Sequence, residues 1–136
     1  QAPTIAHHVA HWLKLNNRYE QAAGLYTALH TTAQTTGDQR GQADALQGLG
    51  ETTRLQDEYG RAANYYGRAL QIYQDIGDRR GQANAHLGLA LLAEGQGQPQ
   101  TAAQAYQSAA TLYTEIGFTE QANQCSTAYQ RIKRKA

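Results

Sequence analysis

Apolar and small residues recur along the chain at the three- and four-residue spacing of amphipathic helices. Ala43, Leu46, Leu49 and Gly50 form one such stripe, and comparable stripes continue to the end of the chain. The pattern therefore predicts an all-α fold of seven helices. We place these helices near residues 5–15, 19–35, 39–55, 59–75, 79–95, 99–115 and 119–133.

The helical pattern repeats with a period of 40 residues. Segments 37–76 and 77–116 align without a gap, and 16 of their 40 positions are identical. A more diverged copy precedes them and half a copy follows, so we expect one domain over residues 1–136 with about three and a half repeats. The predicted repeats span residues 1–36, 37–76 and 77–116, and a capping helix spans residues 117–136.

Turn residues mark the ends of the predicted helices. Gly37, Gly77 and Gly117 stand where a helix should end in a left-handed residue. Other residues have the character expected where the next helix begins. These predicted start signals are Asp38, Asp78, Asn17 followed by Glu20, Asp57 and Pro99.

The composition favours closely spaced helices and excludes several kinds of partner. Leu, Ile, Val and Phe together number only 20, whereas Ala and Tyr number 24 and 9, so small residues and rings must supply the core. A single Val argues against a sheet. A net charge of +1 gives no support for a nucleic-acid or membrane surface. No stretch suits a membrane span, and one cysteine fits a reducing compartment, so we expect a cytoplasmic protein.

The repeat resembles the tetratricopeptide repeat. A small residue in the first helix and an alternation of Ala and aromatic residues in the second carry the resemblance, at Gly50, Ala62, Tyr66 and Ala69 and again 40 residues later. The ordinary period of that family is about 34 residues, so this chain looks like a longer variety, similar to the C-terminal repeats of actinobacterial transcription regulators. The resemblance implies a right-handed α-solenoid of antiparallel helix pairs, with the first helix of each pair lining a concave face.

The resemblance also implies that a protein or peptide partner binds this concave face. Leu87 and Leu91 lie off the packing stripe, so either a peptide docks on them or they merely widen the buried stripe. Gln47 and Glu51 stand where relatives that hold acidic chaperone C-termini use Lys or Asn, which favours a partner of mixed charge. The predicted partner-binding residues are His7, His11, Lys14, Asp44, Gln47, Glu51, Arg54, Asn84, Leu87, Leu91, Glu94 and Gln130.

The sequence shows no constellation typical of catalysis or of a bound cofactor. His7 and His11 are four residues apart on a helix, as two metal ligands would be, but two ligands make an incomplete site. Cys125 is expected in the core. We therefore predict a non-catalytic protein-interaction module, part of a larger bacterial regulator. The alternatives are a sensor of a peptide signal and a His-based metal-binding protein.

The first helix offers more apolar area than one neighbouring helix would cover. Ile5, Val9, Trp12 and Leu13 contribute this area. We expect that further repeats precede this helix in the parent chain, which leaves an edge that can pair with a second copy of the chain.

Overall fold

The structure is a computed structural model that describes residues 2–135, with side chains described from residue 5 onward. Over that range the chain forms seven α-helices and no strands, as predicted. The first helix begins three residues earlier than expected and the last ends two residues later. The helices are α1 (Ala2–Leu15), α2 (Tyr19–Thr36), α3 (Gln39–Leu55), α4 (Tyr59–Ile76), α5 (Arg79–Gly95), α6 (Pro99–Glu115) and α7 (Thr119–Lys135).

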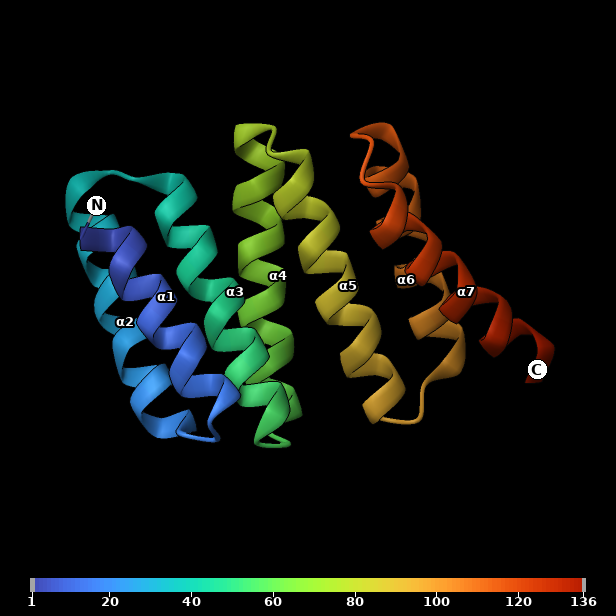
Figure 1. Ribbon diagram of the computed structural model, residues 1–136, viewed down its shortest axis with the longest axis horizontal. Coiled ribbons are helices and arrows are strands. Elements are labelled where there is room, and N and C mark those ends of the chain that lie inside the picture. Colours follow the sequence, from blue (N-terminus) through green and yellow to red (C-terminus); the bar gives the residue numbers. More distant parts are fainter. Residues whose placement is uncertain (1, 136) are drawn as a thin grey trace.

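Successive helices pack against one another in chain order, which produces a helical-repeat solenoid. Figure 1 shows α1, α3, α5 and α7 in a row on the near side, with α2, α4 and α6 behind them and the two ends of the chain at opposite ends of the stack. Contacts also join α1 to α3 and α3 to α5 directly. We call the side formed by α1, α3, α5 and α7 the first-helix face.

The predicted glycine and aspartate signals define the turns that lead into α3 and α5. Gly37 and Gly77 adopt φ angles of 73° and 71° at the ends of α2 and α4. The next residues, Asp38 and Asp78, each accept a hydrogen bond from a backbone N–H in the first turn of the following helix, at 2.9 Å. Both turns therefore match the prediction, and Pro99 likewise opens α6.

Asn17 and Asp57 correct the prediction that they cap α2 and α4. Both have a φ of 61°, and the capping positions belong to the next residue, whose side chain makes no capping bond. Gly97 occupies the equivalent place in the following repeat with a φ of 71°. Asn and Asp are the side chains that tolerate this left-handed conformation best after Gly. These residues therefore reverse the chain direction rather than cap a helix.

Tyrosine rings from the second helices fill the spaces between repeats, as the sequence predicts. The ring of Tyr66 is fully buried between α3 and α5. A Cβ atom added at either Gly50 or Gly88 would lie less than 3.0 Å from that ring. Tyr26 makes the same kind of contact with Gly48 one repeat earlier. Glycine is needed at these helical positions because a methyl group would occupy the space of a ring.

None of the helices within residues 2–135 combines the length and the apolar character required to cross a bilayer.

Candidate functional site

The structure brings the first helices together through polar contacts between residues 37 positions apart. Lys14 Nζ lies 2.5 Å from Glu51 Oε1, which ties α1 to α3. The Gln47 side-chain amide donates to the backbone oxygen of Asn84, at 3.0 Å, and so ties α3 to α5. Glu94 of α5 continues these contacts, because it forms an ion pair with Arg131 of α7. Five predicted site residues therefore lie on one face of the stack. Several of them already have partners within the chain.

Buried tyrosines provide further partners for this face. Tyr73 donates its hydroxyl to Asp44 Oδ1, at 2.5 Å, and Tyr113 donates to Asn84 Oδ1. Burial raises the pKa of Tyr113 to about 12, so its hydroxyl remains a donor at neutral pH. The polar positions 44 and 84 therefore satisfy hydroxyls that would otherwise be buried without a partner.

The other end of the face shows the same arrangement. Arg54 Nε donates to the Tyr66 hydroxyl, at 3.1 Å, and the Tyr106 hydroxyl donates to Glu94. In the sequence, each polar position recurs 40 residues later together with its tyrosine. This recurrence was the signal that could have revealed the bonds at both ends of the face. Four predicted partner-binding residues therefore also stabilise the fold.

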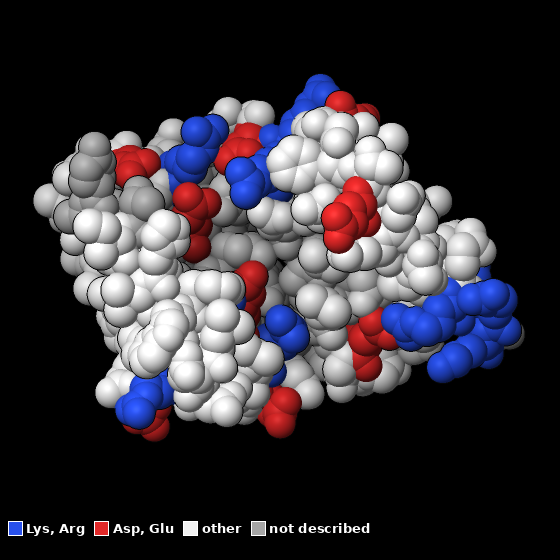
Figure 2. Space-filling view, viewed as in Figure 1, with Lys and Arg blue, Asp and Glu red and all other residues white. Residues whose placement is uncertain are grey.

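The first-helix face contains a depression of about 440 Å³ between α3 and α5. Side chains of both charges surround the hollow on this side of the molecule (Figure 2). An ion pair of 3.0 Å between Arg40 Nε and Asp78 Oδ2 spans the two helices there. The residues that line the depression are Arg40, Asp44, Tyr73, Asp78, Arg80, Gly81 and Asn84.

Asp44 has an unusual electrostatic position in this depression. The residue as a whole remains exposed, but its carboxyl lies against Tyr73, and desolvation there raises the pKa of Asp44 above its ordinary value. The Tyr73 hydrogen bond and the charges of His7 and Arg40 act in the opposite direction. The carboxylate is therefore an incompletely compensated negative charge on the first-helix face.

The apolar pair on α5 divides between the two interpretations that the sequence left open. Leu87 packs against the core cluster of the C-terminal helices, so it widens the buried stripe. Leu91 is 37% exposed. Leu91 is therefore the more exposed of the two and offers the larger apolar contact to a partner.

The two histidines of α1 lie on the same side of the stack. His7 is partly buried, with its ring centroid 6.0 Å from that of Tyr26, and His11 is exposed. No group of three or more His, Cys, Asp or Glu side chains that could hold a metal ion occurs among the described residues.

Gln130 corrects the predicted register of α7. Gln130 was predicted as the counterpart of Leu91, but it lies 39 residues after it, one short of the 40-residue period, whereas α7 begins 40 residues after α5. Arg131 takes the expected place on the first-helix face, and its Nη1 lies 2.9 Å from Glu94 Oε2.

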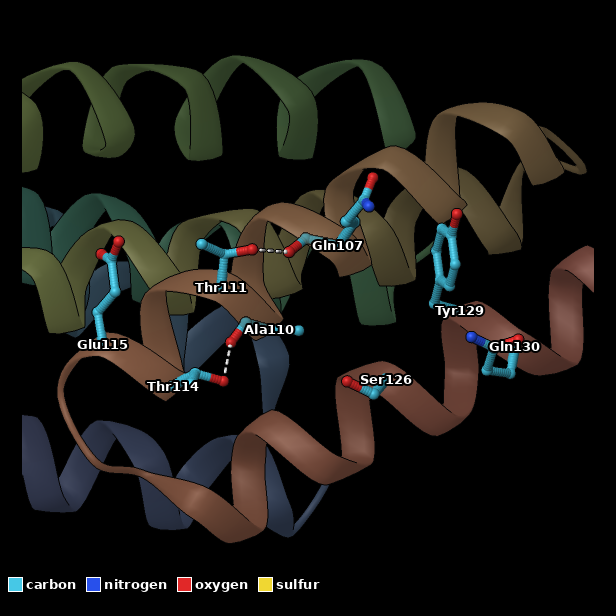
Figure 3. A pocket seen from close by; sticks show the side chains of 8 residues that line it. All are labelled: Gln107, Ala110, Thr111, Thr114, Glu115, Ser126, Tyr129 and Gln130. Carbon is cyan, nitrogen blue, oxygen red and sulfur yellow. Dashed lines mark hydrogen bonds between the residues drawn. The ribbon is translucent and has the colours of Figure 1, made fainter.

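Gln130 lies instead in a second depression, of about 440 Å³, between α6 and α7. Figure 3 shows Ser126, Tyr129 and Gln130 on α7 beside side chains of α6. The hydroxyls of Thr111 and Thr114 bond to carbonyl oxygens of their own helix. The depression is therefore lined by side chains of both α6 and α7, and the role of the last helix as a cap stays a prediction.

The opposite end of the stack is apolar. Ile5, Val9 and Trp12 of α1 are 64%, 45% and 56% exposed, as the sequence led us to expect. Leu13 corrects that set, because it packs against the cluster formed by α1, α2 and α3. Leu15, which the sequence analysis did not select, is 66% exposed.

Comparison with known proteins identifies the family. The family model described as "Soluble NSF attachment protein, SNAP" matches residues 1–135. The chain belongs to the soluble NSF attachment protein family. This family has a tetratricopeptide-like helical-repeat fold, so the predicted kind of repeat is confirmed, while membership of the tetratricopeptide family itself stays a prediction. The SNAP family is described as a non-catalytic adaptor fold.

A solved structure supports the fold of this SNAP family member. The chain is similar to the structure described as "BtubC (BKLC) from P. vanneervenii", with a TM-score of 0.65 and 17% sequence identity. The match covers 98% of this chain and 63% of that protein, so the chain spans less than two thirds of the length of its structural relative. At this identity the likeness shows the fold alone. No curated protein is significantly similar to the chain.

The single cysteine of this SNAP family member is in the core, as predicted. Cys125 is 2% exposed, and burial raises the pKa of its thiol. A raised pKa disfavours the thiolate, which is the nucleophilic form. The thiol is therefore a packing group rather than a reactive one.

Proposed function

We propose that the chain is a non-catalytic protein-interaction module that binds a peptide or helical segment of a partner on its first-helix face, as part of a larger cytoplasmic bacterial regulator. The observation that carries this proposal is the depression between α3 and α5, which is open, polar and lined by two arginines and two aspartates. A surface of this kind suits a segment with charges of both signs. The adaptor character of the SNAP family agrees with it.

The geometry of α5 indicates how such a segment would lie. Asn84 lines the depression, and Leu91 follows on the same side of the helix two turns later, about 10 Å away. Arg80 is exposed at the N-terminal end, where its guanidinium carbon lies 5.6 Å from the centroid of the Phe118 ring. A partner segment that runs along α5 would therefore place an acidic side chain near Arg80 and an apolar side chain against Leu91.

A displayed peptide library selected on the wild-type chain tests this function. Leu91→Glu should weaken the selected peptides by roughly tenfold or more. It removes the apolar contact of a side chain that is 37% exposed in the free chain, and it places a carboxylate where the partner presents an apolar group. Arg80→Glu should select against peptides with an acidic residue. Asn64→Glu, an exposed position on α4, is the matched control and should leave binding unchanged. A selection without binders, or binders unaffected by Leu91→Glu, refutes the proposal.

The exposed stripe on α1 supports a second proposal, self-association. Ile5, Val9 and Trp12 occupy positions equivalent to Ala45, Leu49 and Thr52 of α3, which are only 0%, 4% and 0% exposed. His8 replaces the glycine that admits a tyrosine ring at Gly48, so a tyrosine-bearing second helix could not pack here in the usual way. A second copy that presents the same stripe would cover it without such a ring.

Sedimentation velocity tests self-association directly. The wild-type chain should show concentration-dependent dimers, and Trp12→Glu should convert them to monomers. Thr111→Glu, at an exposed position near the other end of the stack, should leave the dimers intact. A wild-type chain that stays monomeric at high concentration would remove this proposal without affecting the peptide-binding one.

A further inference from the structure

A groove of about 410 Å³ lies between α4 and α6, on the side of α5 away from the first-helix face. His86, Leu89 and Ala93 of α5 line its floor. Gln96 and Gln104 contribute polar groups at its edge. The groove therefore combines an apolar floor with hydrogen-bonding groups around it.

The same place one repeat earlier is filled by a ring of the chain itself. Tyr65 of α4 packs against the clusters that contain Leu46 and Leu49 of α3. These two leucines are only 1% and 4% exposed. Their counterparts 40 residues later, His86 and Leu89, remain partly exposed. The Tyr65 ring is therefore one of the groups that cover these two leucines.

Substitutions between the repeats open the second groove. The position of Tyr65 is taken by Ala105, which lines the groove. Arg61 places its guanidinium carbon 5.9 Å from the centroid of the Tyr65 ring, and its counterpart is Thr101. The long side chain of Arg68 is likewise replaced by Ser108. Thr101 and Ser108 both line the groove. Together with Ala105 they put three shorter side chains on one face of α6, where the earlier repeat has the long side chains that close its groove.

We propose that the groove between α4 and α6 binds a tyrosine side chain presented by a protein partner. The chain shows this occupant in the equivalent place, where the Tyr65 ring covers the floor. The open groove exceeds the roughly 150 Å³ of an apolar cavity that holds benzene. Its edge can bond a phenol hydroxyl through side-chain amides. Burial lowers the pKa of His86, which leaves a neutral imidazole on the floor as a further partner.

Titration with N-acetyl-L-tyrosinamide, followed by NMR of side-chain resonances, tests the proposal. Resonances of His86, Leu89 and Ala105 should shift saturably with a dissociation constant on the order of 1 mM, as suits so small a ligand. N-acetyl-alaninamide, which has the same backbone groups, should cause no such shifts. An N-acetyl-leucinamide that binds as tightly would overturn the choice of a tyrosine side chain.

Ala105→Tyr restores the ring of the earlier repeat and should close the groove. We expect at least about tenfold weaker binding of the probe and a higher midpoint of thermal unfolding, because the new ring buries the floor. Thr111→Tyr adds a ring to α6 outside the groove and should leave binding unchanged. Probe shifts that persist in Ala105→Tyr, or a lowered midpoint for that variant, would overturn the proposal.

Tyr65→Ala gives the converse test. Provided that circular dichroism shows the variant to be folded, it should gain a second set of shifts at Leu46 and Leu49. The absence of that gain in a folded variant would contradict the equivalence of the two grooves. These results are independent of the first-helix face, since the peptide-binding test uses residues on the other side of α5.

Discussion

Replacing Gly88 by alanine would place a methyl group against the ring of Tyr66, which makes this position a sensitive test of how the repeats pack. The ring cannot move far to make room. On its other side, an added Cβ at Gly50 would also lie less than 3.0 Å from it, and its hydroxyl is held by Arg54 Nε at 3.1 Å. Gly88→Ala should therefore overpack the junction between α3, α4 and α5.

Two opposing free-energy terms determine the magnitude. Alanine is favoured over glycine inside a helix by about 1 kcal/mol. Overpacking of a filled core costs about 1–3 kcal/mol. Taking about 2 kcal/mol for a ring held on both sides, Gly88→Ala should lower the free energy of unfolding by about 1 kcal/mol.

Gly67→Ala is the matched control, because Gly67 is exposed on the same helix as Tyr66 and nothing lies within 4 Å of an added Cβ. It gains the same helix propensity without the clash, so it should raise the free energy of unfolding by about 1 kcal/mol. The two variants should thus differ by about 2 kcal/mol.

Urea unfolding followed by circular dichroism at 222 nm measures this difference directly. In a double-mutant cycle, Gly88→Ala should cost less in the Tyr66→Leu background than in the wild-type chain, because the smaller side chain leaves room for the methyl group. If Gly88→Ala were as stable as Gly67→Ala, the ring would not fill this space and the packing account would be wrong.

Two further predictions concern carboxylates of the first-helix face. Asp44→Asn should raise the free energy of unfolding at pH 7, because the raised pKa of Asp44 means that folding disfavours its charged form. The wild-type chain should regain this free energy relative to the variant as the pH falls through the folded-state pKa toward 3.8. An asparagine can keep the tyrosine hydrogen bond, because Asn84 accepts one from Tyr113 at the equivalent position. Equal stability of wild type and Asp44→Asn at pH 7 would therefore show that desolvation of the charged carboxylate does not destabilise the fold. Hydrogen bonding to Arg131 lowers the pKa of Glu94 below 4.5, so wild type should exceed Glu94→Gln in unfolding free energy at pH 7, and that advantage should disappear as the pH falls below 4.5. Urea titrations at pH 7 and pH 3 measure both effects, and a Glu94→Gln difference that does not depend on pH would remove the role of the Arg131 bond.

Short-range signals in the sequence were sufficient to predict the helices. Apolar spacing and the 40-residue period located all seven, and Gly37 with Asp38 marked a turn whose hydrogen bonds join residues only a few positions apart. Such features can be read from the sequence because their energies arise between residues a few positions apart. The resemblance to a repeat family then indicated which helices form the face.

Tertiary packing decided the features on which the candidate site depends. Asp57 has the chemistry of a cap and also of a left-handed turn residue, and the path of the chain into α4 selected the second. The bond from Tyr73 to Asp44 joins residues 29 positions apart, so no local pattern could show it. The groove opened by Ala105 likewise exists only because two second helices stand on either side of α5. Local propensity determines where helices begin and end, whereas the groups left unsatisfied or uncovered depend on which distant side chains meet.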